Sequence, residues 1–363
     1  MNWLLPPLRP TFKAALRDKA AKTARARIAA AERLSEPDDG CERQAIEALL
    51  SLISDGNVEV RRNAVRSLGQ IGSESTLRPL VERLHDDDPT VREFAVIAIS
   101  EIEGDEADAI LRSAINDSYP EVRFQAVQSC VDRTPKQWDK AVKECVRDDD
   151  PKVRAIAAYA LGTVGDKAAR KALVRALDDS ESEVRHQAAV ALAKLGDPRG
   201  ASVLRATLSD PTMLFENLQG LADLKDAASV DLIAELTQGI FRPMMVKVAA
   251  ARALVLLGDA RGVQTLRDVL TAWRWEARSF AVQVVGELKI YELSKQLKAL
   301  SKRMRGTDPE VLARALAELA PENREAMSAL RILAEHKGDK GEPARRELSQ
   351  LLAIEEIGTR KTC

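Results

Sequence analysis

Apolar residues recur along this chain in a pattern typical of helices. If the arginine of each V-R dipeptide is taken as position zero, the first five zero positions follow one another at intervals of 31 residues: Arg61, Arg92, Arg123, Arg154 and Arg185. Apolar residues at −1, +3, +7 and +10 fall on one face of a helix. A second amphipathic segment, such as RKALVRALDD at 170–179, fills the rest of each unit. Each unit therefore predicts two helices.

The pattern extends beyond the five arginines with a less regular spacing. Further zero positions fall at Leu214, Lys247, Arg278 and Leu312, at intervals of 29, 33, 31 and 34 residues. Alanine stands at +3 in eight of these nine units, which favours close packing between helices. No strand pattern appears, so the chain is expected to be all-α.

Residues at fixed places in each unit predict where the helices begin and end. Glycine follows several of the VR helices, as expected for a helix C-terminus. Aspartate stands four residues before position zero in four units and precedes a proline: Asp88, Asp150, Asp210 and Asp308. We predict that these aspartates cap helix N-termini. The repeated DDDP at 86–89 and 148–151 lacks the alternating ligands of a calcium loop.

The segment DDDPKVRAIAAYALGTVGD (148–166) resembles the short HEAT-like repeats of the phycobilisome-lyase type. The resemblance covers roughly residues 41–320. It implies a right-handed α-solenoid of about nine two-helix HEAT-like repeats. Families with this repeat include bilin lyases, hydroxylases and adaptors without catalysis, so function has to be argued from sites.

Segments outside the repeat predict caps at both ends of the solenoid. Residues 1–40 form a basic N-terminal segment, in which 11–34 is expected to be helical, and residues 321–363 form a C-terminal helical cap broken at 337–343. Residues 1–34 carry a net charge of +6 and the remainder −7. The basic segment could contact an anionic membrane, but its apolar residues Phe12, Leu16 and Ile28 are widely spaced.

No catalytic, metal or cofactor motif is found. The three histidines, His85, His186 and His336, are scattered, without the His-Glu pairs that HEAT-like di-iron hydroxylases use. Cys41, Cys130, Cys145 and Cys363 form no CxxC pair, so we interpret them as reduced thiols in a cytoplasmic protein. We expect no metal and no cofactor, and the chain gives no positive sign of an enzyme.

The loops before the VR helices of units six to eight depart from the acidic pattern. They read PTMLF (211–215), FRPMM (241–245) and AWRWEAR (272–278). Methionine, aromatic residues and arginine are enriched at the centres of protein interfaces. We predict a partner-binding surface there, consisting of Met213, Phe215, Phe241, Arg242, Met244, Met245, Trp273, Arg274, Trp275 and Arg278. The alternative is that these residues fill a gap where the spacing of the units is irregular.

Two further surfaces are candidates. A secondary groove along the VR helices would be lined by Ile97, Phe124, Tyr159 and Val190, unless these residues contact the neighbouring helix layer. A basic cluster contains Lys289, Lys295, Lys298, Lys302, Arg303 and Arg305, and a solvated helix face is its default interpretation.

The leading hypothesis is a non-enzymatic scaffold or adaptor that binds a partner protein. The resemblance leaves a bilin-lyase-like enzyme subunit as an alternative. A nucleic-acid-binding HEAT-like protein comes third, because the acidic body lacks the basic face that duplex binding needs.

Overall fold

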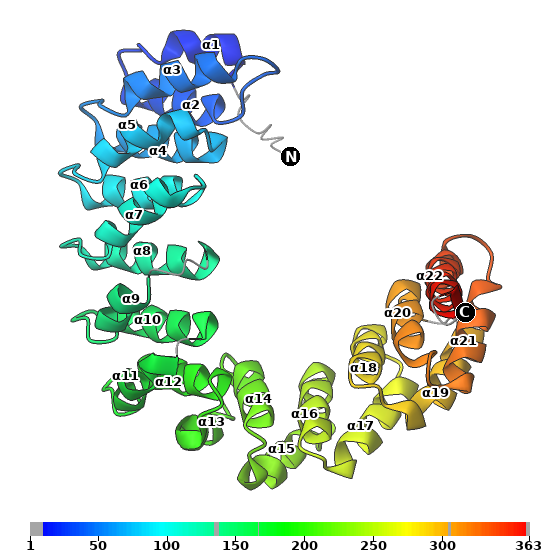
Figure 1. Cartoon of the computed structure of the whole chain (residues 1–363). Helices are drawn as coiled ribbons and strands as arrows, with labels where there is room; N and C mark the ends of the chain where they lie inside the picture. The colour runs from blue at the N-terminus through cyan, green and yellow to red at the C-terminus, as the bar shows by residue number, and fades with distance from the viewer. Residues whose placement is uncertain (1–9, 134–137, 166, 304–305, 361–363) are drawn as a thin grey trace, which may run out of the picture. The chain divides into compact units, whose positions relative to one another are not determined.

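The computed structural model describes residues 10–133, 138–165, 167–303 and 306–360 (Figure 1). It divides into two compact units, Met1–Gly200 and Ala201–Cys363, and each is described by itself. All regular structure in the described residues is helical, so the expected all-α solenoid is confirmed.

The first unit contains twelve α-helices and three short 3-10 turns among its described residues. These are α1 (Phe12–Asp18), α2 (Ala24–Leu34), α3 (Glu42–Leu52), α4 (Val58–Ile71), η1 (Glu74–Thr76), α5 (Leu77–Arg83), α6 (Pro89–Ser100), α7 (Asp105–Ala114), α8 (Pro120–Arg133), α9 (Asp139–Cys145), α10 (Pro151–Val164), η2 (Lys167–Ala169), α11 (Arg170–Ala176), α12 (Ser182–Lys194) and η3 (Pro198–Gly200).

The second compact unit is also built from consecutive helices within the part of the chain that the structure describes. Its elements are α13 (Ala201–Ala206), α14 (Leu214–Asp223), η4 (Ala227–Ser229), α15 (Val230–Leu236), α16 (Met244–Leu256), α17 (Ala260–Thr271), α18 (Trp275–Glu287), η5 (Tyr291–Leu293), α19 (Ser294–Arg303), α20 (Pro309–Leu319), α21 (Arg324–Ala334), η6 (Gly338–Lys340) and α22 (Glu342–Arg360).

The helix pairs from α3/α4 to α19/α20 correspond to the nine units expected from the sequence. Position zero of every unit falls on an even-numbered helix. Within each of the two compact units, Met1–Gly200 and Ala201–Cys363, successive even-numbered helices pack against one another, and the odd-numbered helices form the other layer (Figure 1). This is the arrangement of a helical-repeat stack, in which each repeat buries its apolar face against its neighbours.

Three of the four predicted helix caps are confirmed, and the fourth is wrong: α14 begins only at Leu214, so Asp210, which accepts from Thr212 N–H at 2.9 Å, stabilises the turn before the helix. The Asp88 carboxylate accepts from the backbone N–H of Thr90 at 2.9 Å, and that of Asp150 accepts from Lys152 N–H at 2.8 Å. Asp308 caps α20 in the same way through Glu310 N–H. The third aspartate of each DDDP therefore satisfies backbone donors at a helix N-terminus.

The first aspartate of each DDDP has a different role, which the sequence analysis missed. The Arg61 guanidinium donates two hydrogen bonds to Asp86, at 2.9 and 2.8 Å, and Arg123 does the same to Asp148, at 2.8 and 2.6 Å. Arg92 and Arg154 bind Asp117 and Asp179 with the same geometry. Each arginine thus binds an aspartate 25 residues further along the chain, in the next repeat.

Each of these aspartates also bonds the arginine that follows it. The backbone carbonyl of Asp148 accepts from Arg154 at 2.9 Å, while its carboxylate binds Arg123. Arginines and aspartates therefore alternate in a continuous series from Arg61 to Arg185, which we call the ladder. The Arg154 guanidinium holds the pKa of Asp179 below its usual value by hydrogen bonding to the charged form.

The N-terminal segment is an additional repeat pair rather than one basic helix. It forms α1 and α2, separated by residues 19–23. Arg27 on α2 donates to the Asp55 carboxylate at 2.6 and 2.9 Å and to the Ala21 carbonyl at 2.8 Å, which are the contacts of a ladder arginine. The structure therefore extends the ladder into residues 21–55.

Small residues bring the even-numbered helices into close contact. A Cβ added to Gly162 on α10 would lie 2.6 Å from the Ala191 Cα atom on α12. Gly69 and Gly286 show the same approach to Ala98 and Ala315. A side chain at these glycines would need to move the neighbouring backbone, so glycine allows this close spacing.

Burial makes the thiol of Cys145 unreactive. Cys145 on α9 is buried, and burial raises its pKa to about 11, whereas Cys41 is half-buried. Because the thiolate is the reactive form, we expect iodoacetamide to label Cys41 at least about tenfold faster than Cys145 at neutral pH. Peptide mapping by mass spectrometry measures both rates, and denatured protein should label the two equally. Equal rates in the folded chain would contradict the burial. The side chains of Cys130 and Cys363 lie outside the described residues.

Candidate functional site

The predicted partner-binding surface contains five of the exposed large apolar side chains of the described residues. Phe241 is 93% and Trp273 is 84% exposed, and Phe215, Met245 and Trp275 are also exposed. Ile240, which the sequence analysis did not select, is 89% exposed. We call the exposed side chains of loops 211–215, 240–245 and 272–275 the rim. All of them lie in the unit Ala201–Cys363.

Other residues predicted for this surface contribute to packing instead. Met213 and Met244 are half-buried, and Met244 packs against the apolar core. Arg278 is half-buried and donates to the carbonyls of Ala272, at 2.9 Å, and Gly306. These contacts resemble those of a ladder arginine, with a carbonyl in place of the aspartate. Arg278 thus links α18 to the loop before α20.

Two arginines of the rim are exposed. The Arg274 guanidinium lies over the Trp273 ring, 5.3 Å from its centroid, a cation–π arrangement. Arg242 makes no side-chain ion pair with another described residue. The rim therefore combines aromatic, aliphatic and cationic groups, the mixture found at protein-interface centres.

An apolar groove of about 480 Å³ adjoins the rim, and we call it the rim groove. Its walls come from the ends of α13 and α15 and the starts of α14 and α16. The lining residues are Arg205, Ala206, Leu208, Ser209, Pro211, Leu214, Leu232, Glu235, Leu236, Arg242, Pro243 and Val246. Of these, only Arg242 was predicted as a site residue. One sign of this groove was visible in the sequence, because Leu214 stands where the regular repeats have an arginine. The groove itself depends on how consecutive repeats pack.

The proposed secondary groove is less open than the sequence suggested. Val190 is 5% exposed and is therefore buried, which corrects its assignment as a groove wall. Ile97, Phe124 and Tyr159 are half-buried, and Phe124 packs against the core. Lys194 lies over the Tyr159 ring, 4.6 Å from its centroid. Ile97, Tyr159 and Val190 stand at +5 of their units and Phe124 at +1, and at both positions the side chain is at least half-buried.

The two basic candidates are partly engaged within the chain. Lys298 donates to Glu325 at 2.8 Å, and this hydrogen bond lowers the pKa of Glu325. Lys289, Lys295, Lys302 and Arg303 are exposed, and Arg305 lies outside the described residues. In the N-terminal segment Phe12 is buried, and Leu16 and Ile28 pack against the core, so these three side chains face the protein rather than a membrane.

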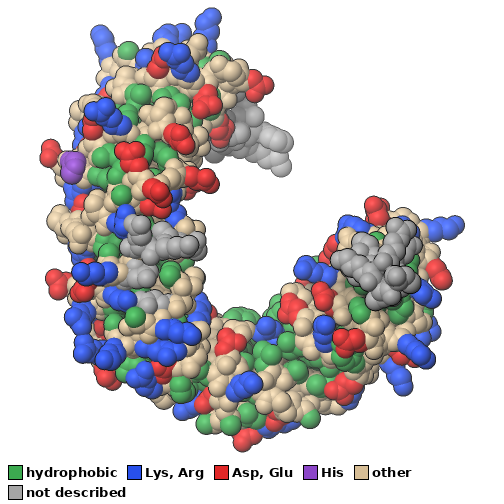
Figure 2. All heavy atoms as spheres, viewed as in Figure 1, with side chains coloured by type: hydrophobic (Ala, Val, Ile, Leu, Met, Phe, Trp, Pro, Cys, Tyr) green, Lys and Arg blue, Asp and Glu red, His purple; other side chains and the backbone are tan. Residues whose placement is uncertain are grey.

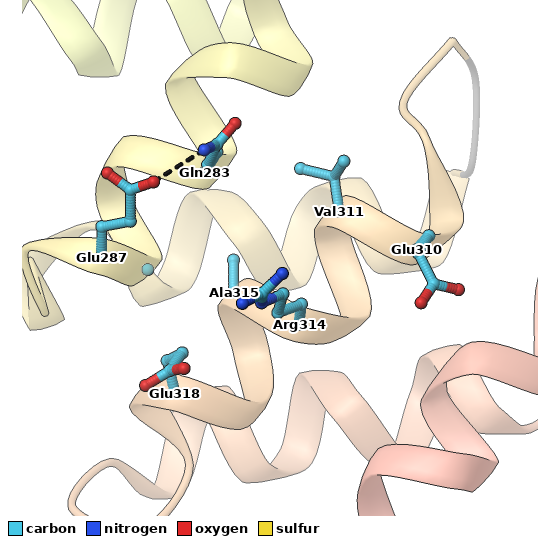
Figure 3. Close-up of a pocket in the computed structure, with 8 residues that line it drawn as sticks. Gln283, Glu287, Glu310, Val311, Arg314, Ala315 and Glu318 are labelled. Carbon is cyan, nitrogen blue, oxygen red and sulfur yellow. Dashed lines mark hydrogen bonds between the residues drawn. The ribbon is translucent and has the colours of Figure 1, made fainter. Parts of the chain in front are cut away.

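A second pocket, of about 300 Å³, lies between α18 and α20 (Figure 3). Figure 3 shows Gln283 donating to Glu287 on one helix, opposite Val311, Arg314 and Ala315 on the next. Glu310 and Glu318 complete the lining, in which three glutamates stand beside one arginine. Arg346 on α22 pairs with Glu310, so part of this charge is already neutralised.

Figure 2 shows hydrophobic side chains interspersed with charged ones over the visible face of the unit Ala201–Cys363. None of the helices in the described residues combines the length and apolar character needed to cross a membrane. Within the same part of the chain, no three His, Cys, Asp or Glu side chains gather as a metal-binding group.

Comparisons with known proteins agree with the repeat pattern. The chain matches the family model for HEAT repeats over residues 46–130 and 139–214, and that for the PBS lyase HEAT-like repeat over residues 246–271. A comparison with curated proteins gives no match.

Solved structures of other helical-repeat proteins are similar in fold. Importin beta, crystallised in ammonium sulfate, aligns with a TM-score of 0.56 and 15% identity, covering 92% of this chain and 56% of that chain. The Escherichia coli protein YibA gives 0.52 and 21%, covering 71% and 95%. The complex of CpcE and CpcF of phycocyanin lyase from Nostoc sp. gives 0.45 and 19%, covering 62% and 92%. At these identities the likeness concerns the fold alone.

Proposed function

Because this chain is a HEAT-like repeat protein, we propose that it acts as a non-enzymatic scaffold that binds a partner protein through the rim. The observation that carries the proposal is the clustering of exposed apolar side chains. Ten large hydrophobic side chains are exposed among the described residues, and seven of them fall between residues 215 and 275. Such concentrations on a soluble protein usually mark interaction sites.

The rim has the features of an interface centre. Trp273 and Phe241 are large side chains with few rotatable bonds, so ordering them on binding costs little conformational entropy. Arg242 and Arg274 add hydrogen-bond donors beside them. In the ladder, by contrast, arginines are committed to aspartates of the next repeat. The rim groups are therefore free to serve a partner.

The PBS lyase HEAT-like match supports the repeat type over residues 246–271 and no particular reaction. A bilin-lyase-like enzyme subunit remains the second hypothesis. Incubation with a bilin and an apoprotein substrate tests it, and a coloured covalent adduct would favour it over a scaffold.

Truncating both exposed tryptophans should abolish partner capture without unfolding the chain. We expect Trp273→Ala/Trp275→Ala to retain at most about one tenth of the partner that wild type captures from a lysate of the source cells, since aromatic anchors dominate interface energetics. Both side chains are exposed, so their removal opens no core cavity. Quantitative mass spectrometry measures the capture, and circular dichroism checks the fold.

The matched control is Tyr119→Ala/Leu352→Ala, which removes two exposed apolar side chains away from the rim. This variant should capture as much partner as wild type. Equal capture by all three proteins would rule out the rim as the binding surface.

A further inference from the structure

The rim groove lies at the place where a regular repeat has a groove lined by a ladder ion pair. The equivalent groove in the first unit is lined by Arg123, Ala141, Glu144 and Cys145, together with Asp148. Ala141 and Glu144 follow the zero position Arg123 by 18 and 21 residues, as Leu232 and Glu235 follow Leu214. In the regular groove, Arg123 and Asp148 are hydrogen-bonded to each other, so these two charged groups are satisfied within the chain.

At the rim groove, apolar residues stand at the two positions that correspond to that ion pair. Leu214 takes the arginine position. Phe241, six residues before the zero position Lys247, takes the position that Asp148 has before Arg154. Leu214 lines the groove, Leu232 is 43% exposed on its wall, and Phe241 is almost fully exposed. The junction therefore presents an apolar surface on which Phe241 is almost uncovered by the described residues.

The charge at the mouth of the groove is reversed relative to the two repeats that contain DDDP. Arg242 stands five residues before position zero, where Asp87 and Asp149 stand in their repeats. The stretch 237–247 contains Arg242 and Lys247 and no acidic residue. Glu235 is the one carboxylate of the described lining, and it projects from α15, whereas Arg242 lies in the loop before α16. A ligand carboxylate is therefore favoured on the α16 side.

We propose that the rim groove binds a short acidic peptide segment of the partner protein, with an aliphatic or aromatic side chain seated against Leu214 and Leu232. A carboxylate next to that side chain pairs with Arg242 and so supplies the negative charge that the ladder provides elsewhere. Apolar contact gives the affinity and the Arg242 pair selects acidic over basic sequences. This inference rests on the proposed scaffold function and names the chemistry of its partner.

Selection from a displayed library of random dodecapeptides tests the proposal on the full-length chain. Peptides are selected on wild type and counter-selected on Leu232→Glu. We expect the enriched peptides to carry an aliphatic or aromatic residue flanked by Asp or Glu. Absence of enrichment over Leu232→Glu, or enrichment of basic peptides, would overturn the proposal.

Binding of a synthetic copy of the top peptide, measured by fluorescence anisotropy, gives the quantitative test. We expect Leu232→Glu, Leu232→Ala and Arg242→Glu each to weaken binding at least about tenfold, the effect of losing an interface anchor. Lys140→Glu, in the regular groove lined by a ladder ion pair, is the control and should bind like wild type. Circular dichroism confirms that the variants fold. If Arg242→Glu bound the peptide as tightly as wild type, the proposal that Arg242 selects acidic peptides would be wrong.

Two other occupants give distinct results. A peptide of residues 1–10, MNWLLPPLRP, is apolar and basic, and tighter binding of this peptide would assign the groove to the chain's own N-terminus. If wild type formed a dimer and the Leu232→Glu substitution dissociated it, the groove would be assigned to a second copy of this chain. Failure of the peptide tests, with partner capture still dependent on Trp273 and Trp275, would overturn the groove assignment and leave the scaffold function standing.

Discussion

Replacing Asp148 with asparagine is expected to lower the free energy of unfolding by about 3 kcal/mol, because it breaks a mostly buried ion pair and leaves the other charge uncompensated. The side chains of Arg123 and Asp148 are 16% and 11% exposed. The Asp148 carboxylate also accepts from the Asp150 N–H, at 2.9 Å. The loss therefore affects both the contact between repeats and the loop before α10. Urea unfolding followed by circular dichroism measures it.

The neighbouring aspartates provide matched controls. The Asp149 side chain is exposed and makes no ion pair with another described residue, so Asp149→Asn should change stability by less than about 0.5 kcal/mol. Asp150→Ala removes the cap of α10 and should cost about 1 kcal/mol. Equal effects of Asp148→Asn and Asp149→Asn would contradict the ladder.

The ladder also predicts how the Asp148→Asn effect depends on pH. Burial opposes ionisation of Asp148, but the hydrogen bonds from Arg123 and the Asp150 N–H outweigh it, and the net pKa is lowered. A lowered pKa in the folded state stabilises the protein above the unfolded pKa of about 3.9, and this stabilisation is lost as pH falls through the folded value. The difference between wild type and Asp148→Asn should therefore be complete at neutral pH and shrink below about pH 4.

Gly162→Leu should be the other strongly destabilising substitution, by about 3 kcal/mol, because overpacking forces side chains and backbone to move. The added side chain would start 2.6 Å from the Ala191 Cα atom, so α10 and α12 would have to separate. Leucine has a higher helix propensity than glycine, by under about 1 kcal/mol, which offsets only part of this cost. Thermal unfolding of the variant measures the effect.

Thr163→Leu is the control for Gly162→Leu. Thr163 is the next residue of α10 and is exposed, and its hydroxyl accepts a surface hydrogen bond from Lys194 on α12 at 3.4 Å, so a leucine side chain there can extend into solvent instead of into the contact between the two helices. Its effect should stay within about 0.5 kcal/mol of wild type. If both leucine variants were equally stable, α10 and α12 would have to lie further apart than the structure has them.

The helical repeat could be predicted from the sequence because its signals are local. Spacing of apolar residues around Arg154 defines one face of a helix, and Asp150 before Pro151 caps that helix within four residues. The nine expected pairs were found. The segment 11–34 was expected to be helical as one segment, but it forms two helices, α1 and α2, that pack against each other.

The rim could be selected from the sequence, but its packing could not. Methionine and tryptophan in loops 241–245 and 272–275 departed from the repeat, and Phe241 and Trp273 are exposed. Because both residues are methionine, their hydrophobicity could not predict that Met245 is exposed and that Met244 packs against the core. Binding of a partner at the rim remains a prediction.

The sequence by itself determined the repeat, its helices and most of the predicted caps, because these depend on residues within a few positions of one another. The tertiary structure alone decided that Asp148 binds an arginine 25 residues earlier, that Gly162 contacts another helix, and that Leu214 lines a groove. Each of these depends on which atoms of a neighbouring repeat come within contact distance. Identical sequence motifs such as DDDP therefore contain residues with different roles, and only the packing of consecutive repeats separates them.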